Sequence, residues 1–412
     1  MPHKAREATV HHVAVSASNE TVTGKRPETE LLLRSMRVVP DPDHGDPGKE
    51  LFRTGLDWND VVRSAAAHWV TPLLYSRLQA TCPDAVPPAV LAQLRDGFRN
   101  NIVQNLFLTG ELLTLLELFE SQAIRVLPFK GLTLAAVAYG DPALRYPGDL
   151  DLLIPERDVP RARALLAARG YRPRIDLSGA QETAYLRSLC QLAFVRDDSA
   201  FMVELHTQIM PRAFPFPLDC ESLWPRRVST ALGGRQVPSL APEDLLLVLC
   251  VHGAKHVWSC LRWICDVAQL VRARADMDWT RVTEQARVLR IERVLSLGLV
   301  LAADLLAAPV PEHIVRKARA DPRVASLALE VSRRLFGQDA GPVSGLGSMR
   351  FHFRVRERRL DGIRYGISLA TVPTPADWVS LRLPAPLFPV YYVLRAMRLA
   401  GKYVRMALRS RS

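Results

Sequence analysis

The stretch of sequence that decides the fold is Asp141-Pro142-Ala143-Leu144-Arg145-Tyr146-Pro147-Gly148-Asp149-Leu150-Asp151-Leu152-Leu153-Ile154. Its second half alternates as a β-strand does, with successive side chains on opposite faces. Asp149 and Asp151 therefore share one face. Two carboxylates this close repel each other unless a cation or a proton lies between them. Mg²⁺ is commonly held by one or two carboxylates plus substrate phosphates, so we expect a metal site here, although D-x-D also occurs by chance at solvated strand edges.

The segment before this stretch predicts an anion site. Residues 124–129 are mostly apolar and run into Lys130 and Gly131, and residues 132–139 have the composition of a short helix. The free N–H groups and the dipole of a helix N-terminus both favour an anion, and Lys130 adds a point charge for a phosphate. The chain has no G-x-x-x-x-G-K-[ST] and no G-x-G-x-x-G motif, which excludes the two best-known glycine-rich phosphate loops.

A second alternating stretch follows at residues 201–206. The alternation places Glu204 and His206 on one face, so Glu204 is a candidate third acid and His206 a candidate helper. An ordinary outward-facing strand residue remains the alternative for Glu204. Because Mg²⁺ prefers oxygen, we expect His206 to contact a substrate or a ligand residue, not the ion.

These segments together resemble the DNA polymerase beta-like nucleotidyltransferase superfamily. More closely, the chain is similar to an uncharacterised bacterial nucleotidyltransferase family with the motifs L-K-G, Y-x-D-P-x-x-R-x-x-x-D-x-D-h-L and E-x-H, which fall here at residues 129–131, 139–153 and 204–206. The resemblance covers roughly residues 29–412. One departure is that the superfamily's usual Gly-Ser before the metal strand is Lys-Gly here, with a longer gap to the aspartates.

The resemblance implies a Mg²⁺-dependent enzyme, with Mn²⁺ as the alternative ion. It would move a nucleoside monophosphate from an NTP such as ATP to a small molecule, sugar or peptide acceptor, releasing pyrophosphate. Catalytic and metal-binding roles would fall to Asp149, Asp151 and Glu204. Nucleotide or phosphate binding would fall to Lys130, Gly131 and Arg145, the last either neutralising the transferred phosphate or forming a salt bridge. The alternative is a catalytically silent nucleotide-binding or partner-binding protein of the same fold.

A helix is expected from Ala241 onward, with Pro242 tolerated in its first turn. On it His252 and His256 lie four residues apart and so share a face. Without the Glu of H-E-x-x-H zinc is disfavoured, and we expect His252, Lys255 or His256 to contact substrate across the cleft, or the histidines to be ordinary core residues. Arg262 and Asp266 have the spacing of an intrahelical pair.

The predicted fold class is α/β (α+β), a nucleotidyltransferase core with a mixed sheet flanked by N-terminal and C-terminal helical regions. Five parts are expected: a disordered tail (1–28), an N-terminal helical region (29–110), the catalytic core (111–240), a helical domain (241–340) and a C-terminal extension with a basic amphipathic helix (341–412). On that last helix the basic residues form one stripe in an apolar setting, at Arg395, Arg398, Lys402, Arg405 and Arg409. Docking on the protein itself is the favoured interpretation, and a partner or peripheral contact with a membrane surface is the alternative.

Composition indicates which classes of binding partner and which cellular location to expect. The 412 residues carry 54 Lys and Arg against 42 Asp and Glu, a net charge of +12 that favours polyanions. No helix-turn-helix, RNP or zinc-finger motif indicates sequence-specific nucleic-acid binding. The six cysteines have no C-x-x-C spacing, and neither a signal peptide nor an uncharged apolar run of membrane-spanning length is evident. We therefore expect a cytoplasmic protein.

Overall fold

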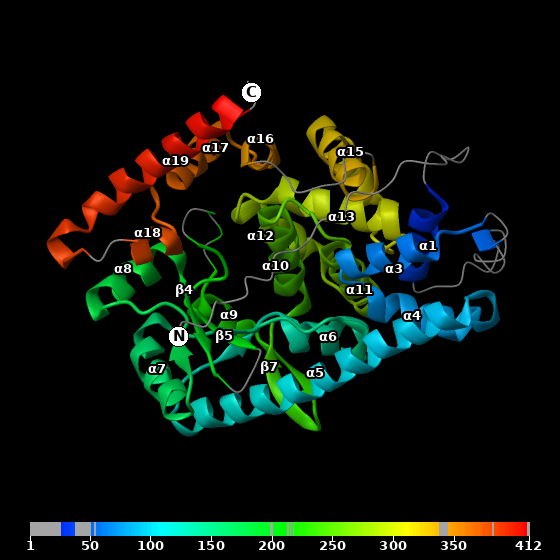
Figure 1. Cartoon of the computed structure of the whole chain (residues 1–412), viewed down its shortest axis with the longest axis horizontal. Coiled ribbons are helices and arrows are strands. Elements are labelled where there is room, and N and C mark those ends of the chain that lie inside the picture. The colour runs from blue at the N-terminus through cyan, green and yellow to red at the C-terminus, as the bar shows by residue number, and fades with distance from the viewer. Residues whose placement is uncertain are drawn as a thin grey trace.

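The computed structural model of the chain contains one five-stranded sheet among many helices (Figure 1). It describes residues 26–37, 51–52, 55–197, 201–211, 214, 216, 218–337, 345–380 and 383–409. The predicted disordered tail falls almost wholly outside the described residues.

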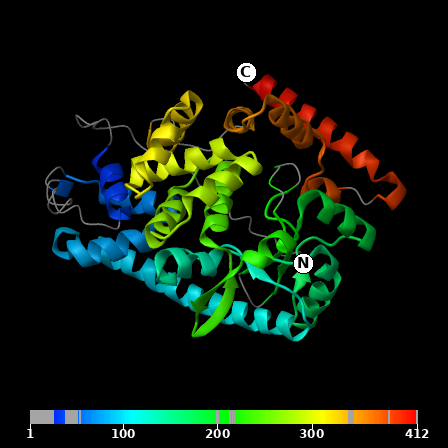
Figure 2. The same ribbon diagram turned by 180° about the vertical axis from the view of Figure 1, so that it is seen from behind.

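Helices form the N-terminal part, as the three-and-four spacing of its apolar residues predicts. They are α1 (Pro27–Met36), α3 (Trp58–Ala67), α4 (Thr71–Thr81) and α5 (Pro88–Ser121). Asp57 caps α3 by accepting hydrogen bonds from the backbone N–H groups of Asn59 and Asp60. The 34-residue α5 runs along the molecule beneath both the sheet and the helical region, and the view from behind shows the same arrangement (Figure 2).

The sheet is mixed, as expected. Its strands are β1 (Leu127–Pro128), β2 (Leu150–Leu153), β3 (Arg172–Pro173), β4 (Gln191–Val195) and β5 (Met202–His206). Their order is β1-β2-β5-β4-β3, and only the central β2–β5 pair is parallel. The two acid-bearing strands are therefore direct neighbours at the centre of the sheet.

Short helices and a hairpin surround the sheet. They are α6 (Gly131–Tyr139), α7 (Val159–Ala168), α8 (Gly179–Leu189), α9 (Cys220–Leu223) and the hairpin of β6 (Val228–Leu232) and β7 (Arg235–Ser239). The sequence analysis missed α8. A capping box between Asp219 and Ser222 starts α9.

A helical region follows the hairpin. Its helices are α10 (Pro242–Lys255), α11 (Leu261–Ala273), α12 (Trp279–Val288), α13 (Glu292–Leu306), α14 (Glu312–Arg319) and α15 (Pro322–Phe336). After it come α16 (Gly345–Val355), α17 (Arg359–Thr371), α18 (Pro375–Ser380) and α19 (Pro389–Arg409). The long C-terminal helix predicted from Pro389 is therefore present.

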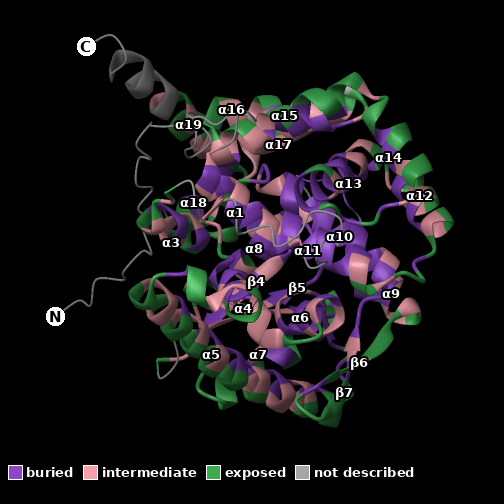
Figure 3. Ribbon diagram, turned by 90° about the vertical axis from the view of Figure 1, so that its right-hand side faces the viewer, coloured by how far each residue is buried: buried purple, intermediate pink, exposed green. Residues whose placement is uncertain are grey.

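Two hydrophobic cores stabilise these parts. The larger one joins the N-terminal helices to the helical region, and α10, α11 and α13 are buried at its centre (Figure 3). The smaller one lies around the sheet and includes Trp378 of α18 and Tyr391 of α19. Helix α5 contributes to both, through Leu94 to the larger and Leu112 to the smaller. Trp378 contacts Tyr185 of α8, and Tyr391 accepts a hydrogen bond from Gln181 of α8, so α18 and α19 dock on α8 beside the sheet. Intramolecular docking of α19 was the favoured interpretation of the sequence.

Helix α5 is relevant to whether the chain contains a segment that could span a membrane. By length and composition it could cross a membrane, which the sequence analysis did not expect of any segment. Only 28% of its most apolar window is buried in the structure. One such helix is weak evidence, because long helices of soluble proteins meet the same criterion.

Candidate metal and nucleotide site

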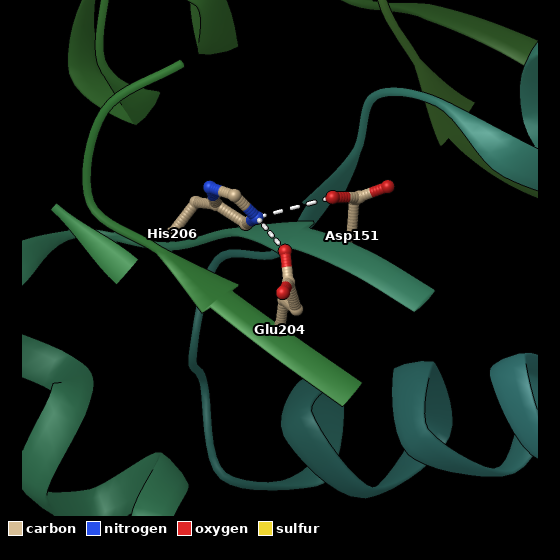
Figure 4. A group of neighbouring side chains, drawn as sticks. All are labelled: Asp151, Glu204 and His206. Carbon is tan, nitrogen blue, oxygen red and sulfur yellow. Dashed lines mark hydrogen bonds and ion pairs between the residues drawn. The ribbon is translucent and has the colours of Figure 1, made fainter. Parts of the chain in front are cut away.

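Pairing of β2 with β5 brings the predicted acids together. The two strands run parallel with Asp151 directly opposite Glu204, so the two carboxylates leave the same face of the sheet side by side. Figure 4 shows both pointing toward His206. Ligand atoms of all three side chains lie within 4.8 Å of one another.

His206 bridges the two acids. Its Nε2 lies 3.1 Å from Asp151 Oδ1 and 3.2 Å from Glu204 Oε2 (Figure 4). Burial lowers the pKa of His206, but the hydrogen bonds and charges of the two carboxylates outweigh burial, so its pKa lies above the ordinary value. The edge of its ring meets the Phe129 ring, with centroids 5.0 Å apart. The two carboxylates therefore favour the protonated form of His206.

Asp149 lies just before β2, next to this cluster. Burial, followed by the charges of Glu204 and Asp151, raises the pKa of Asp149 to about 6, although Lys130 partly opposes this. The carboxylate is half-buried. Ionising it at neutral pH thus costs free energy that a bound cation would recover.

The predicted anion site lies on the other side of Asp151. Lys130 Nζ is 3.0 Å from Asp151 Oδ1, and Gly131 begins α6 with φ +60°. A Cβ at Gly131 would lie 3.4 Å from the Asp149 backbone oxygen. No side chain among the described residues caps this helix N-terminus. A small pocket lined by Lys130, Gly131, Asp149 and Asp151 opens here, so backbone N–H groups and carboxylates border the same space.

The contacts of Arg145 differ from the predicted phosphate contact. Its Nε and Nη2 donate to the two carboxylate oxygens of Asp266, at 2.7 and 3.0 Å, and both side chains are buried. Tyr139 donates a further hydrogen bond to Asp266, at 2.7 Å. The expected pairing of Arg262 with Asp266 is corrected too: Arg145 takes that carboxylate, and the Arg262 guanidinium carbon lies 5.2 Å from the Trp69 ring centroid. Arg145 therefore ties the approach to β2 to α11.

Lys255 of α10 lies near the acidic cluster, and the contact of this set with substrate stays a prediction. Burial and Lys130 lower the pKa of Lys255, whereas Glu204 and Asp151 oppose the shift, so all four charges lie within interaction range. His252 and His256 lie beside it with ring centroids 4.7 Å apart. Burial lowers the pKa of both, that of His256 to about 3, so both are neutral at pH 7.

Two further residues near the acids were missed. Gln191 Nε2 donates to Glu204 Oε1 at 3.4 Å, and the positive charge of Arg174 lowers the pKa of Asp149. Both belong to the neighbouring β4 and β3 side of the sheet, where Gln191 pairs with His206. Alternation along β4 was a usable signal for Gln191, because it fixes which of its residues share the face of the acids.

The residues present fit a divalent cation. Two carboxylates and an imidazole converge, burial and the neighbouring carboxylates raise the pKa of a third carboxylate, and Lys130 pairs with Asp151. Oxygen-rich sets of this kind suit Mg²⁺ or Mn²⁺, and the imidazole widens the choice to other transition metals.

A mixed sheet with acids clustered on its two central strands is consistent with a nucleotidyltransferase domain. The chain belongs to the family described as "Uncharacterised nucleotidyltransferase", whose family model matches residues 54–307. That range spans α3 to α13 and includes the whole sheet. Comparisons with curated proteins and with solved structures gave no match. Membership supports transferase activity in general and implies an NTP substrate.

Proposed function

We propose that the protein is a Mg²⁺-dependent nucleotidyltransferase that moves a nucleoside monophosphate from an NTP to the hydroxyl of an acceptor. The observation that carries the proposal is the register of β2 with β5, which places Asp151 beside Glu204 with Asp149 at the entrance to the same strand. Three carboxylates from neighbouring strands, next to an uncapped helix N-terminus, suit a metal-bound polyphosphate.

In the proposed reaction an acceptor oxygen forms a bond to the α-phosphorus while the bond from that phosphorus to the bridging oxygen breaks. Pyrophosphate leaves with the electron pair, and the acceptor proton passes to Glu204. Cations held by Asp149, Asp151 and Glu204 would lower the pKa of the acceptor hydroxyl and neutralise the leaving pyrophosphate.

The other residues position the substrates. Lys130 and the first turn of α6 contact the phosphates, and His206 fixes the orientations of Asp151 and Glu204. Arg145 acts through Asp266 and the loop before β2, not through the transferring phosphate. Placement in the polymerase beta-like superfamily, a cytoplasmic location and a small-molecule, sugar or peptide acceptor complete the proposal.

Pyrophosphate release tests the proposal. Wild-type protein is incubated with each labelled NTP, Mg²⁺ and a cell extract, and nucleotidylated products are identified by mass spectrometry. Asp151→Asn should lower pyrophosphate release by at least about a hundredfold, because it removes a charge from the centre of the cluster. Asp197→Asn is the matched control, since Asp197 is exposed and pairs with Arg172 at the end of β4. It should leave the rate unchanged.

Activity that survives Asp151→Asn would contradict the proposed mechanism. Calorimetry distinguishes the proposed enzyme from the alternative, a nucleotide-binding protein without catalytic activity. Tight binding of ATP and Mg²⁺ without consumption of any NTP would favour that protein over an enzyme.

A further inference from the structure

A row of basic side chains leads away from the acidic cluster along the C-terminal end of α10 and the end of α16. We call this row the basic strip; it consists of Lys255, His256, His352 and Arg356. Lys255 interacts electrostatically with Lys130 and Asp151 at one end. His256 interacts with Lys255 and with His352, and His352 interacts with Arg356 at the other end. The geometry agrees: α10 packs against α16, and the His352 ring centroid lies 4.8 Å from that of Tyr365, whose ring contacts Arg356.

Arg356 is the most informative member. It is 8% exposed, yet none of the described acidic side chains forms a salt bridge with it. Its Nε and Nη2 are buried without a hydrogen-bond partner among the residues that the structure describes. Burial lowers the pKa of Arg356 to about 10, although Tyr365 and Asp361 oppose the shift. A buried guanidinium without an acceptor is costly, and leaving such donors unpaired is rare in folded proteins.

Aromatic rings hold this guanidinium in place without satisfying it. Its central carbon lies 4.6 Å from the Phe214 ring centroid and 4.3 Å from that of Tyr365, and the two rings meet at 83°. Ring faces stabilise the charge through cation–π attraction. They offer no oxygen to the N–H donors in the guanidinium plane, so the rings leave the hydrogen-bonding capacity of Nε and Nη2 unused.

The chemistry of the strip selects an anion with several oxygens. An arginine fork suits phosphate oxygens in pairs, a lysine adds a point charge, and two neutral imidazoles can donate or accept. His352, Arg356 and Tyr365 lie beyond the family match at residues 54–307. The outer end of the strip is therefore supplied by the C-terminal part of this chain.

We propose that the basic strip binds a phosphate-rich anion, either the polyphosphate of the NTP or a phosphate carried by the acceptor. The proposal extends the proposed function, because it names the chemical class of the ligand that the basic strip binds. It rests on that function for the identity of the anion only, because binding can be measured without any transfer reaction.

Calorimetric titration with inorganic tripolyphosphate in EDTA tests the strip directly. Wild-type protein should bind the anion, and Arg356→Met should weaken binding by about tenfold or more, since a charge-assisted bidentate contact is lost. Arg350→Met is the matched control, because it removes the same charge at an exposed position on α16, the helix that ends one residue before Arg356. It should bind within about twofold of wild type, the range expected for a distant exposed charge.

Lys255→Met keeps the test decisive if Arg356→Met fails to fold, and it should weaken binding similarly. The proposal would be overturned if wild-type protein did not bind tripolyphosphate, or if Lys255→Met bound it as tightly as the control Arg350→Met. Asp151→Asn should retain tripolyphosphate binding in EDTA. If it does while wild type transfers no nucleotide, the strip stands and the proposed function fails.

Competition between tripolyphosphate and a non-hydrolysable NTP shows whether the bound anion belongs to the nucleotide or to the acceptor. If the strip holds the nucleotide's own phosphates, a non-hydrolysable NTP with Mg²⁺ should displace tripolyphosphate, and Arg356→Met should weaken NTP binding. If the strip holds the acceptor's phosphate, tripolyphosphate or orthophosphate should still bind to protein saturated with that NTP.

Discussion

Asp149 is a residue whose ionisation is unfavourable in the folded protein. Its pKa of about 6 exceeds the ordinary value near 3.8 because burial and two neighbouring carboxylates disfavour ionisation. The folded protein therefore holds the proton more tightly than the unfolded chain does between these two pH values. Stability falls as pH rises through this window, and the full cost is present above about pH 6.

Asp149→Asn should therefore stabilise the metal-free protein at pH 7. The gain is at most about 3 kcal/mol, the equivalent of the pKa difference, and it should vanish near pH 3.5, where the wild-type carboxyl is protonated. Denaturant unfolding in EDTA at the two pH values measures it. Asp197→Asn should show no gain, because Arg172 lowers the pKa of the exposed Asp197. A variant less stable than wild type at pH 7 would contradict the role of charge repulsion.

Gly131 and Gly140 offer a matched pair at the two ends of α6. Both have positive φ, +60° and +71°, so alanine at either position should cost about 1 kcal/mol of stability. Only Gly131 borders the pocket at Asp149, where a methyl group would obstruct close approach of a phosphate to the backbone. Gly131→Ala should raise the KM for NTP while Gly140→Ala leaves it unchanged. Equal KM values for both variants would argue against phosphate binding at this turn.

Contacts from helices α5 and α11 hold the loop that leads into β2, the strand that carries Asp151. Asn105 of α5 donates to the Arg145 backbone oxygen at 3.2 Å, and Asn101 donates to the Ala143 oxygen at 2.6 Å. The Arg145 side chain reaches Asp266 of α11. The loop that leads into β2 is thus fixed from two helices, and we expect it to transmit any disturbance to the site.

Arg145→Met should destabilise the protein by about 3–5 kcal/mol, because it leaves Asp266 buried without its cation. The double variant Arg145→Met with Asp266→Asn should recover part of this loss, since no unpaired charge remains. Urea unfolding of the single and double variants measures the coupling. If Arg145→Met instead abolished activity with little loss of stability, Arg145 would contact the transferring phosphate after all.

Local pattern predicted much of the architecture at this scale. Helices α6, α10 and α19 lie close to where composition and spacing placed them. The side chains of Glu204 and His206 also share a face, as their spacing requires. Helix α8 was missed although its capping box, Ser178 with Gln181, was readable in the sequence.

What escaped prediction has no local signal. Arg145 and Asp266 lie 121 positions apart, so nothing in either segment indicates that they pair, and the spacing of Arg262 suggested a different partner. The same holds for Arg356, which becomes notable only once Phe214 and Tyr365 are seen beside it. Long-range packing, not propensity, sets these contacts.

At the scale of the whole molecule, positive charge is concentrated at one end. Residues 345–412 contain 13 lysines and arginines against 3 acidic residues, so they carry +10 of the chain's net +12. Two of the basic residues predicted to form one stripe on α19 contact the protein itself: Arg395 donates to the Leu369 backbone oxygen, and Arg398 pairs with Asp377. Among the residues of α19 whose side chains the structure describes, Val390, Val393 and Met397 are exposed at a spacing of three and four.

Helix α17, which packs against α19, exposes a stripe of the same spacing at Leu360, Ile363 and Ile367. Exposed apolar stripes in a strongly basic region are typical of surfaces that bind anionic membranes, where apolar burial and electrostatic attraction act together. This supports the peripheral membrane contact that was the alternative to purely intramolecular docking of α19, and the two are compatible, because the docked face and the exposed face differ.

The protein should therefore sediment with phosphatidylglycerol-containing vesicles and not with phosphatidylcholine vesicles, and salt should weaken binding because it screens the basic charge. The double variant Val393→Glu and Met397→Glu should lower binding by at least about fivefold, since it removes two apolar contacts and adds two negative charges. The matched control, Val288→Glu with Leu329→Glu, makes equivalent changes at exposed apolar positions on α12 and α15. If both pairs weakened binding equally, net charge alone would account for the attraction and the outward face of α19 would have no part in it.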